Sequence, residues 1–178
     1  MNHRILDSEN QKEIAGLFIS VFTSSEGEKE GKLLGKLVSE LSSDIDNEEI
    51  ICIGSYENES LIGCIFFTRL QFNESILVYM LAPVAVSTEF QGKGIGQALI
   101  KYGLNLLKDR SANIAITYGD PSFYSKVGFK PLPEEIIQAP LQLSIPAGWL
   151  GQSLTGDPIL TINERPTCVK AFNDPVYW

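Results

Sequence analysis

Two amphipathic helical patterns open the chain. Apolar residues recur at three- and four-residue spacing over Ile14–Phe22 and again over Leu33–Leu41, which predicts two helices that each bury one face. A short strand is expected before them at Arg4–Leu6. Ser8 and Gln11 have the spacing of a capping box, so we expect the first helix to begin there.

The middle of the chain has the pattern of a β-meander. Ile50–Tyr56, Leu61–Phe72 and Ile76–Val86 are rich in β-branched and aromatic residues, and short polar segments separate them as in antiparallel hairpins. Pro83 lies inside the third run and cannot donate to a strand ladder. We therefore expect a bulge near Pro83 that leaves neighbouring amides unpaired. Ile114–Tyr118 predicts a further strand.

Prolines interrupt the apolar pattern in the last quarter of the chain. Strands are expected at Leu141–Ile145 and Ile159–Ile162, with a further one at Cys168–Phe172. A length of 178 residues with 44% hydrophobic content suits one domain with a real core, and no shift in composition marks a boundary. We expect a single domain over residues 1–178, in which 131–178 is a C-terminal extension that completes the sheet and the acceptor site.

A glycine cluster joins the third β-run to a third helical pattern. The cluster is Gln91-Gly92-Lys93-Gly94-Ile95-Gly96, and the helix follows at once, with Ile95, Ala98, Leu99, Tyr102 and Leu106 on the expected apolar face. The first N–H groups of a helix lack intrahelical acceptors and attract anions. Glycines have no Cβ and let a phosphate approach the backbone. The sequence therefore predicts an anion-binding strand–loop–helix junction.

The spacing excludes two common glycine-loop motifs. A P-loop requires Gly, four residues and Gly-Lys-Ser/Thr, but Gly94 follows Lys93 and no glycine stands at the required place before it. A dinucleotide fingerprint requires GxGxxG, whereas Gly92, Gly94 and Gly96 fall as GxGxG.

The run resembles the Q/R-x-x-G-x-G/A signature of the GNAT superfamily of N-acetyltransferases, with Gln91, Gly94 and Gly96 at its fixed positions. A second segment, GDPSFYSKVGF, begins at Gly119 and resembles the GNAT element in which a short helix carries a tyrosine four residues before a Gly-Phe pair. Tyr124 holds that position. The resemblance is specific over roughly residues 50–129.

The resemblance implies an α/β (α+β) GNAT fold. Its central sheet is expected to have about six or seven strands, mostly antiparallel, with a splayed parallel pair in the middle and helices on both faces. The co-substrate is expected to be acetyl-CoA, held at Val84, Ala85, Val86, Gln91, Gly92, Lys93, Gly94, Ile95, Gly96 and Gln97. Lys101 and Lys126 are further lysines near the phosphate loop in sequence.

The implied reaction is direct transfer of acetyl to a primary amine of a small molecule or peptide in a ternary complex. Tyr124 would donate to the leaving thiolate, and a strand amide near Ala85 would stabilise the oxyanion. The general base stays open between Glu89, Asp120, a water chain and no base at all. A non-catalytic acyl-CoA sensor or regulatory module, and an O- or longer-chain acyltransferase on the same fold, are alternatives.

Composition narrows the partners. A net charge of −8 disfavours binding to nucleic acid and suits a cationic acceptor. We expect the polar run Ser24–Gly31 to be a loop, in which Glu26, Glu28 and Glu30 could bind such an acceptor. A solvated acidic loop without a binding role is the simpler interpretation. One histidine, His3, and three separated cysteines argue against a zinc site or a disulfide framework. The chain has no long apolar run and no signal core, so we expect a cytoplasmic protein that binds no membrane. We also expect a monomer or homodimer without a metal ion.

Overall fold

The computed structural model describes all residues from Met1 to Trp178, and the chain divides into two compact units. Unit 1 contains Met1–Phe67 and Pro83–Tyr102, and unit 2 contains Thr68–Ala82 and Gly103–Trp178. The assignment of the whole chain to one domain stays a prediction.

Seven strands form a mixed sheet, as expected, in the order β1-β2-β3-β4-β5-β7-β6. The strands are β1 (Asn2–Leu6), β2 (Ile50–Glu57), β3 (Ser60–Leu70), β4 (Val78–Val86), β5 (Ile114–Tyr118), β6 (Lys130–Pro131) and β7 (Trp149–Ser153). β4 and β5 are parallel, whereas β1 with β2, β5 with β7 and β6 with β7 are antiparallel. The parallel register ends at Leu81↔Thr117, and β4 continues beyond it to Val86.

Four α-helices and six short 3-10 helices accompany the sheet. The α-helices are α1 (Gln11–Glu26), α2 (Glu28–Ser43), α3 (Ile95–Asp109) and α4 (Pro121–Tyr124). The 3-10 helices are η1 (Ser8–Asn10), η2 (Thr88–Phe90), η3 (Ser125–Val127), η4 (Pro146–Gly148), η5 (Lys170–Phe172) and η6 (Pro175–Tyr177). None of the helices has the length and apolar character needed to cross a membrane.

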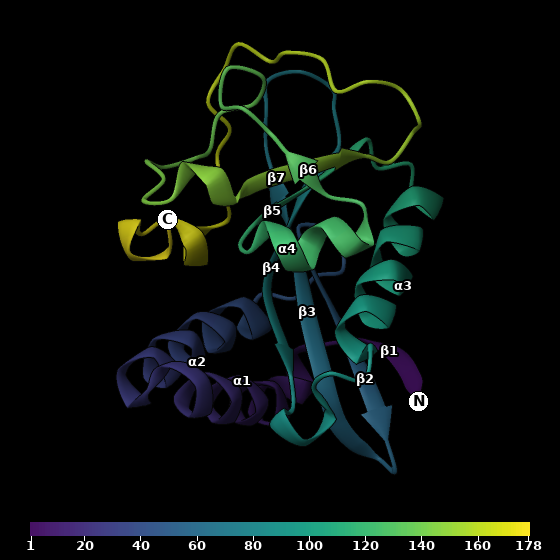
Figure 1. Cartoon of the computed structure of the whole chain (residues 1–178), viewed down its shortest axis with the longest axis vertical. Coiled ribbons are helices and arrows are strands. Elements are labelled where there is room, and N and C mark those ends of the chain that lie inside the picture. The colour runs from purple at the N-terminus through teal and green to yellow at the C-terminus, as the bar shows by residue number, and fades with distance from the viewer. The chain divides into compact units, whose positions relative to one another are not determined.

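In unit 1, α1 and α2 lie side by side and form a helical hairpin (Figure 1). The expected loop over Ser24–Gly31 is wrong, because Gly27 alone, at φ 99°, reverses the chain. Glu26 closes α1, and Glu28 and Glu30 stand in the first turn of α2, where carboxylates favour the positive helix end. The three glutamates therefore do not lie on a loop.

The start of α1 also differs from the expectation. The capping box is formed by Asp7 and Asn10, not Ser8 and Gln11: the Asp7 carboxylate accepts from Glu9 N at 2.9 Å, and Asp7 N donates to Asn10 Oδ1 at 3.1 Å. This box caps η1, which precedes α1, and Asn10, the residue before α1, makes no side-chain cap hydrogen bond to α1. The apolar stripe of α1 is confirmed, with Ile14, Leu17, Phe18 and Val21 buried.

The β2–β3 hairpin turns at Asn58 and Glu59, which have φ values of 49° and 61°. Two successive positive φ values are typical of the tight turns that match the twist of paired strands. The hairpin is therefore confirmed. It carries Cys52 and Cys64 to a facing position on β2 and β3, with their Sγ atoms 3.4 Å apart.

The third helix is confirmed, but its buried face is not the expected one throughout. Ile95 and Leu99 are buried as expected, and Leu104 and Leu107 complete the buried face. Tyr102 was assigned to this face and is instead 39% exposed. The centroid of its ring lies 5.0 Å from that of the His3 ring of β1, with the two ring planes tilted by 46°.

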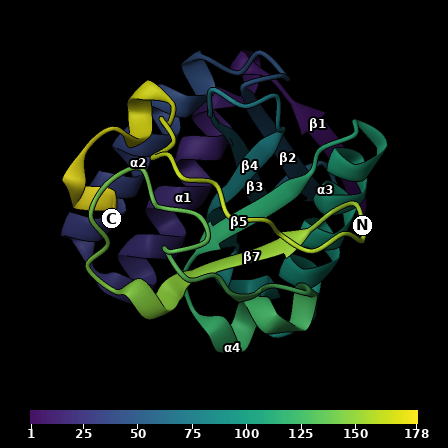
Figure 2. The same ribbon diagram turned by 90° about the horizontal axis from the view of Figure 1, so that it is seen from above.

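In unit 2, the C-terminal part of the chain forms β7, which lies beside β5 in Figure 2 and pairs with it from Tyr118↔Trp149 to Ile114↔Ser153. The strands expected at Leu141–Ile145, Ile159–Ile162 and Cys168–Phe172 are wrong. Prolines flank these runs and interrupt strand pairing.

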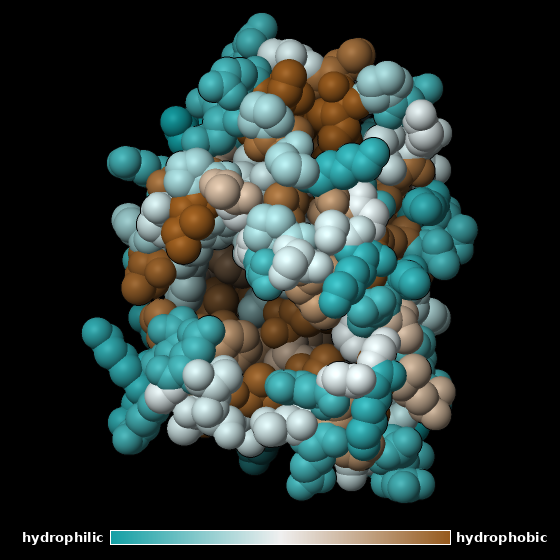
Figure 3. Space-filling model, viewed as in Figure 1, coloured by the Kyte–Doolittle hydropathy of each residue, from teal (hydrophilic) through white to brown (hydrophobic).

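Some apolar side chains of these runs point to solvent. Ile145 is 65% and Leu160 75% exposed. Hydrophobic residues reach the molecular surface among hydrophilic ones in Figure 3. Apolar character in this part of the chain therefore does not report strand formation.

Candidate functional site

In unit 1, the loop between β4 and α3 leaves backbone donors and open space together. Gly92 and Gly94 have φ values of 75° and 78°, and a Cβ added to either would meet no atom within 4 Å. The first hydrogen bond that enters α3 runs from Ala98 N to Gly94 O at 3.0 Å. The amides of the three preceding residues, Ile95, Gly96 and Gln97, therefore have no intrahelical acceptor. Such a helix start attracts an anion such as a phosphate.

The Gln91 side chain fastens this loop to the strand before it. Its Nε2 donates to Val86 O at 2.9 Å. Ser87, the residue after Val86, donates its N–H to Ile62 O of β3 at 2.8 Å. Gln91 therefore sets the path of the loop through the end of β4.

The other expected cofactor contacts occupy two kinds of environment. Val84 and Val86 are half-buried and Ala85 is buried, following the strand alternation, while the Ile95 side chain points into the core. Lys93 is exposed, with its Nζ 5.0 Å from the centroid of the Phe90 ring. To a bound anion, Ile95 can thus offer its backbone amide, and Lys93 can offer an exposed positive charge.

In unit 2, α4 is a single turn that presents Tyr124. Asp120 caps it, since its carboxylate accepts from Ser122 N at 2.9 Å and from Ser122 Oγ at 2.8 Å. Gly128, in the left-handed conformation at φ 95°, ends the following η3 turn. Phe129 N then donates to Tyr124 O at 3.2 Å, so the Gly-Phe pair closes back on the tyrosine.

Aromatic and glycine contacts surround the Tyr124 ring. The rings of Phe123 and Phe129 meet it edge-on at centroid distances of 5.0 and 5.9 Å. A Cβ added to Gly119 would lie 2.7 Å from Tyr124 Cε2. Burial, opposed by the Thr117 hydroxyl and assisted by the Asp120 charge, raises the pKa of Tyr124 to about 12. The phenol is therefore neutral at ordinary pH and available as a hydrogen-bond donor.

The glycine loop and Tyr124 both lie within a region that is similar to a known family of domains. Residues 47–131 match the model of the acetyltransferase (GNAT) domain. This segment, just under half of the chain, is similar to the GNAT acetyltransferase domain. Among curated proteins, it is 34% identical over 114 residues to the uncharacterized N-acetyltransferase YjhQ of Escherichia coli (strain K12), a match that spans 60% of this chain and 62% of the relative. The chain thus covers less than two thirds of the length of this curated relative.

Solved GNAT structures share the fold. The crystal structure of the family member YhbS from Escherichia coli in complex with CoA superposes with a TM-score of 0.79 at 21% identity, covering 97% of this chain and 92% of that one. A GNAT acetyltransferase from Brucella melitensis in complex with acetyl-CoA gives a TM-score of 0.68 at 22% identity and covers 97% of each chain.

The two carboxylates considered as a general base differ in their surroundings. Glu89 is exposed in η2 of unit 1. Asp120 is engaged as a helix cap, and the hydrogen bonds from the Ser122 hydroxyl and amide lower the pKa of its carboxyl. A lowered pKa makes Asp120 a weaker base. His3 is half-buried, and burial together with the N-terminal charge lowers its pKa, in a position that packs on Tyr102.

The three cysteines and the other possible metal ligands show no arrangement for further chemistry. Cys52, Cys64 and Cys168 are free thiols, and the expected packing of Cys52 against Cys64 is confirmed. No group of three or more His, Cys, Asp or Glu side chains is arranged to hold a metal ion.

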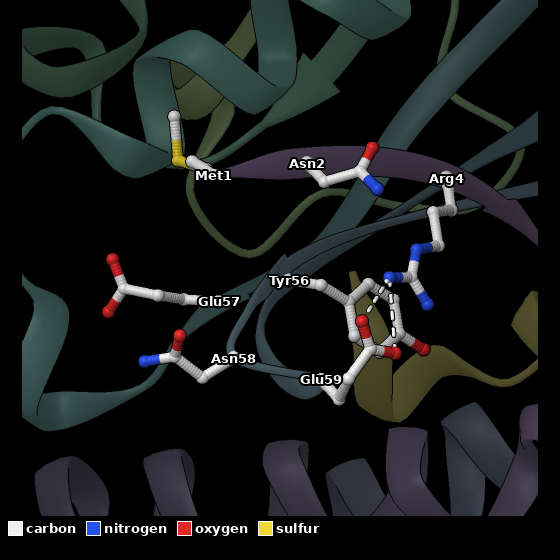
Figure 4. A pocket seen from close by; sticks show the side chains of 7 residues that line it. All are labelled: Met1, Asn2, Arg4, Tyr56, Glu57, Asn58 and Glu59. Atoms are coloured by element: carbon white, nitrogen blue, oxygen red, sulfur yellow. Dashed lines mark hydrogen bonds and ion pairs between the residues drawn. The ribbon is translucent and has the colours of Figure 1, made fainter.

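Sequence reasoning missed a hollow of about 370 Å³ in unit 1, shown in Figure 4. Arg4 points across this hollow, pairs with Glu59 at 3.1 Å and lies 4.3 Å from the Tyr56 ring centroid. Tyr56 in turn donates to Glu13. Arg4, Glu59 and Tyr56 are therefore engaged with neighbouring side chains and are not free to bind a ligand. Arg4 and Glu59 lie far apart in sequence, so no local pattern predicts that they meet.

Proposed function

We propose that this protein is an acyl-CoA-dependent N-acyltransferase that moves acetyl from acetyl-CoA to a primary amine of a small molecule or peptide. The observation that carries the proposal is the open loop at Gly92 and Gly94, followed by helix-start amides without intrahelical acceptors. These residues fit a pyrophosphate, because they offer several N–H donors and room for an anion. Lys93 adds an exposed positive charge.

Each residue has a separate task in this reaction. The amides from Gly92 to Gln97 would hold the pyrophosphate, while Val84–Val86 would align the acyl arm and supply an amide to the oxyanion. Bound acetyl-CoA supplies the activated thioester. The amine acceptor would be held in the same ternary complex, so that the attack is effectively unimolecular.

Tyr124 would donate a hydrogen bond to the leaving sulfur. Its pKa of about 12 exceeds that of an ordinary thiol, about 8.5, by about 3.5, so complete proton transfer to a thiolate is uphill by about 5 kcal/mol. Tyr124 therefore acts mainly by stabilising the developing charge. The lowered pKa of Asp120 favours a water chain, or an acceptor that arrives neutral, over this carboxylate as the base. The free thiols are consistent with a reducing cytoplasm as the place of action.

The test is calorimetric titration with acetyl-CoA beside a thiol-release assay over pooled polyamines, aminoglycosides, amino acids and N-terminal peptides. Micromolar binding with thiol release for one pool is expected. Binding without release from any pool would favour an acyl-CoA sensor instead, and absence of binding would overturn the proposal.

A matched pair of variants places the binding site. Gly94→Asp adds a negative side chain to the loop and should weaken acetyl-CoA binding at least tenfold, since like charges 4 Å apart repel by up to about 4 kcal/mol at a dielectric constant near 20. Gly156→Asp is the control, because Gly156 also has a positive φ, 86°, and open space around it. The control should bind acetyl-CoA like the wild type.

A further inference from the structure

The end of β5 is enclosed by aromatic and polar contacts that the proposed reaction does not use. Tyr118 is the last residue of β5, and its hydroxyl accepts from Ile145 N at 2.7 Å and lies 3.2 Å from Ser144 Oγ. The Trp178 ring stacks on the Tyr118 ring, with centroids 6.3 Å apart and planes at 17°. Trp149 meets the Tyr118 ring edge-on at 6.4 Å.

Trp178 is fixed on several sides. Its Nε1 donates to Phe172 O at 2.8 Å, and its ring centroid lies 6.1 Å from those of Phe172 and Trp149. Only 5% of Trp178 and 1% of Trp149 is exposed. Because Trp149 and Trp178 are buried, neither offers an open ring face to a cationic ligand, and Trp178 can act only on the residues that it contacts.

The backbone after Tyr118 leads directly to Tyr124. Gly119 follows Tyr118 and donates its N–H to Gly148 O at 2.9 Å. A Cβ on Gly148 would lie 3.0 Å from Gly119 O, and a Cβ on Gly119 would lie 2.7 Å from Tyr124 Cε2. The Tyr124 ring therefore lies on a backbone whose place is set by Tyr118 and Gly148.

We propose that Trp178 is a positioning residue for Tyr124, acting through Tyr118 and Gly119. By stacking on Tyr118, it fixes the junction between β5 and α4 and so aims the Tyr124 hydroxyl at the leaving sulfur. This inference rests on the proposed acetyl transfer. A displacement of about 1 Å of a reacting group can cost about 100-fold in rate, so a contact this far from the chemistry has a measurable effect.

The test compares Trp178→Ala, Trp178→Leu and Trp178→Phe in the full chain, with Val176→Ala as control because Val176 is 55% exposed in the same segment. The readouts are kcat for thiol release with the amine pool that supports turnover, the acetyl-CoA Kd by calorimetry, and the ionisation of Tyr124 by NMR of Cζ-labelled tyrosine, assigned with Tyr124→Phe.

For Trp178→Ala and Trp178→Leu, kcat should fall about 10- to 100-fold, while the acetyl-CoA Kd stays within about twofold of wild type. The Tyr124 pKa should move from about 12 toward the ordinary value of about 10 as its packing loosens. Trp178→Phe keeps an aromatic ring to stack on Tyr118, so its kcat and its Tyr124 pKa should stay close to those of the wild type. Val176→Ala should match the wild type.

A folded Trp178→Ala or Trp178→Leu protein with wild-type kcat and wild-type Tyr124 titration would overturn the inference. Trp178→Leu keeps apolar volume in the cluster and serves if the alanine variant fails to fold. Absence of turnover in the wild type would instead count against the acetyl-transfer proposal. In that case the Tyr124 titration still decides whether Trp178 holds the tyrosine in place.

Discussion

The Gln91 side-chain amide donates to the Val86 carbonyl at 2.9 Å, and this bond ties the glycine loop to the end of β4. The two parts that it joins have different proposed tasks. Val86 ends the strand that would align the acyl arm, and Gln91 begins the loop that would hold the pyrophosphate. One side chain would thus set the distance between the segments proposed to hold the acyl arm and the pyrophosphate.

Gln91→Ala should weaken acetyl-CoA binding by about fivefold, because loss of one neutral hydrogen bond costs about 1 kcal/mol and frees the loop. The measurement is the acetyl-CoA Kd by calorimetry at fixed salt. Gln91→Arg keeps a side-chain donor and should recover most of the affinity. Asn105→Ala, at an exposed position of α3, is the control. Equal Kd values for Gln91→Ala and wild type would refute the anchoring role.

Local motifs made much of this site predictable from sequence. The positive φ values of Gly92 and Gly94 follow from a glycine loop that must turn a strand into a helix. Asp120 stands directly before Pro121, a common sequence at a helix start, and it caps α4 in the structure. In these segments neighbours in sequence determine the conformation, so a linear pattern is sufficient.

The C-terminal extension was mispredicted because distant partners determine it. The strand in this region is β7, Trp149–Ser153, whose glycine and polar residues give a weak strand pattern. β7 exists through pairing with β5 on one side and β6 on the other. Leu141–Ile145 has the better apolar pattern but no strand partner, and Ile145 is largely exposed. Periodicity alone does not report which run finds a partner.

Gly119→Ala should lower kcat without changing the acetyl-CoA Kd, because the added Cβ would fall 2.7 Å from Tyr124 Cε2 and displace the ring. Tyr124→Phe should lower kcat about 100-fold, the lower range for loss of a hydrogen-bond donor that stabilises a developing charge. If Gly119 acts through Tyr124, then Gly119→Ala should have little further effect on kcat in the Tyr124→Phe background.

Gly16→Ala is the control for an added methyl group, since a Cβ at Gly16 of α1 meets nothing within 4 Å. Additive losses of kcat in the double variant would show that Gly119 and Tyr124 act independently. That outcome would contradict the packing argument.

The buried thiol pair should resist chemical modification. Cys52 and Cys64 are fully buried, and burial together with the neighbouring Cys64 raises the pKa of the Cys52 thiol. Cys168 is only half-buried. A native protein treated with an aromatic disulfide reagent at pH 8 should therefore release the equivalent of one thiol rapidly, and the remaining thiols should react only after unfolding.

Cys168→Ser should abolish the rapid reaction of the native protein and leave the reaction of the other two thiols after unfolding unchanged. Rapid reaction of two or more thiols in the native protein would contradict the burial of the pair. The same variant also removes the background from thiol-release assays of acetyl transfer.

Tyr124 should make the fold less stable at high pH. Its folded-state pKa, about 12, lies above the ordinary value of about 10 that applies after unfolding. The neutral phenol is thus favoured by folding, so its contribution is complete below pH 10 and is lost as the pH rises from about 10 to about 12. Between pH 9 and pH 11 this linkage removes about 1 kcal/mol of the free energy of unfolding.

Urea unfolding at pH 9 and pH 11 measures the effect. Tyr124→Phe should lose less stability than the wild type over this interval, because phenylalanine has no proton to release. Both proteins should still lose part of their stability through Tyr56, because burial and the Glu13 hydrogen bond raise the pKa of that phenol too. Tyr102→Phe, at a position that is 39% exposed, is the control, and its free energy of unfolding should fall by as much as that of the wild type. Equal losses in wild type and Tyr124→Phe would show that the Tyr124 phenol is not buried by the fold.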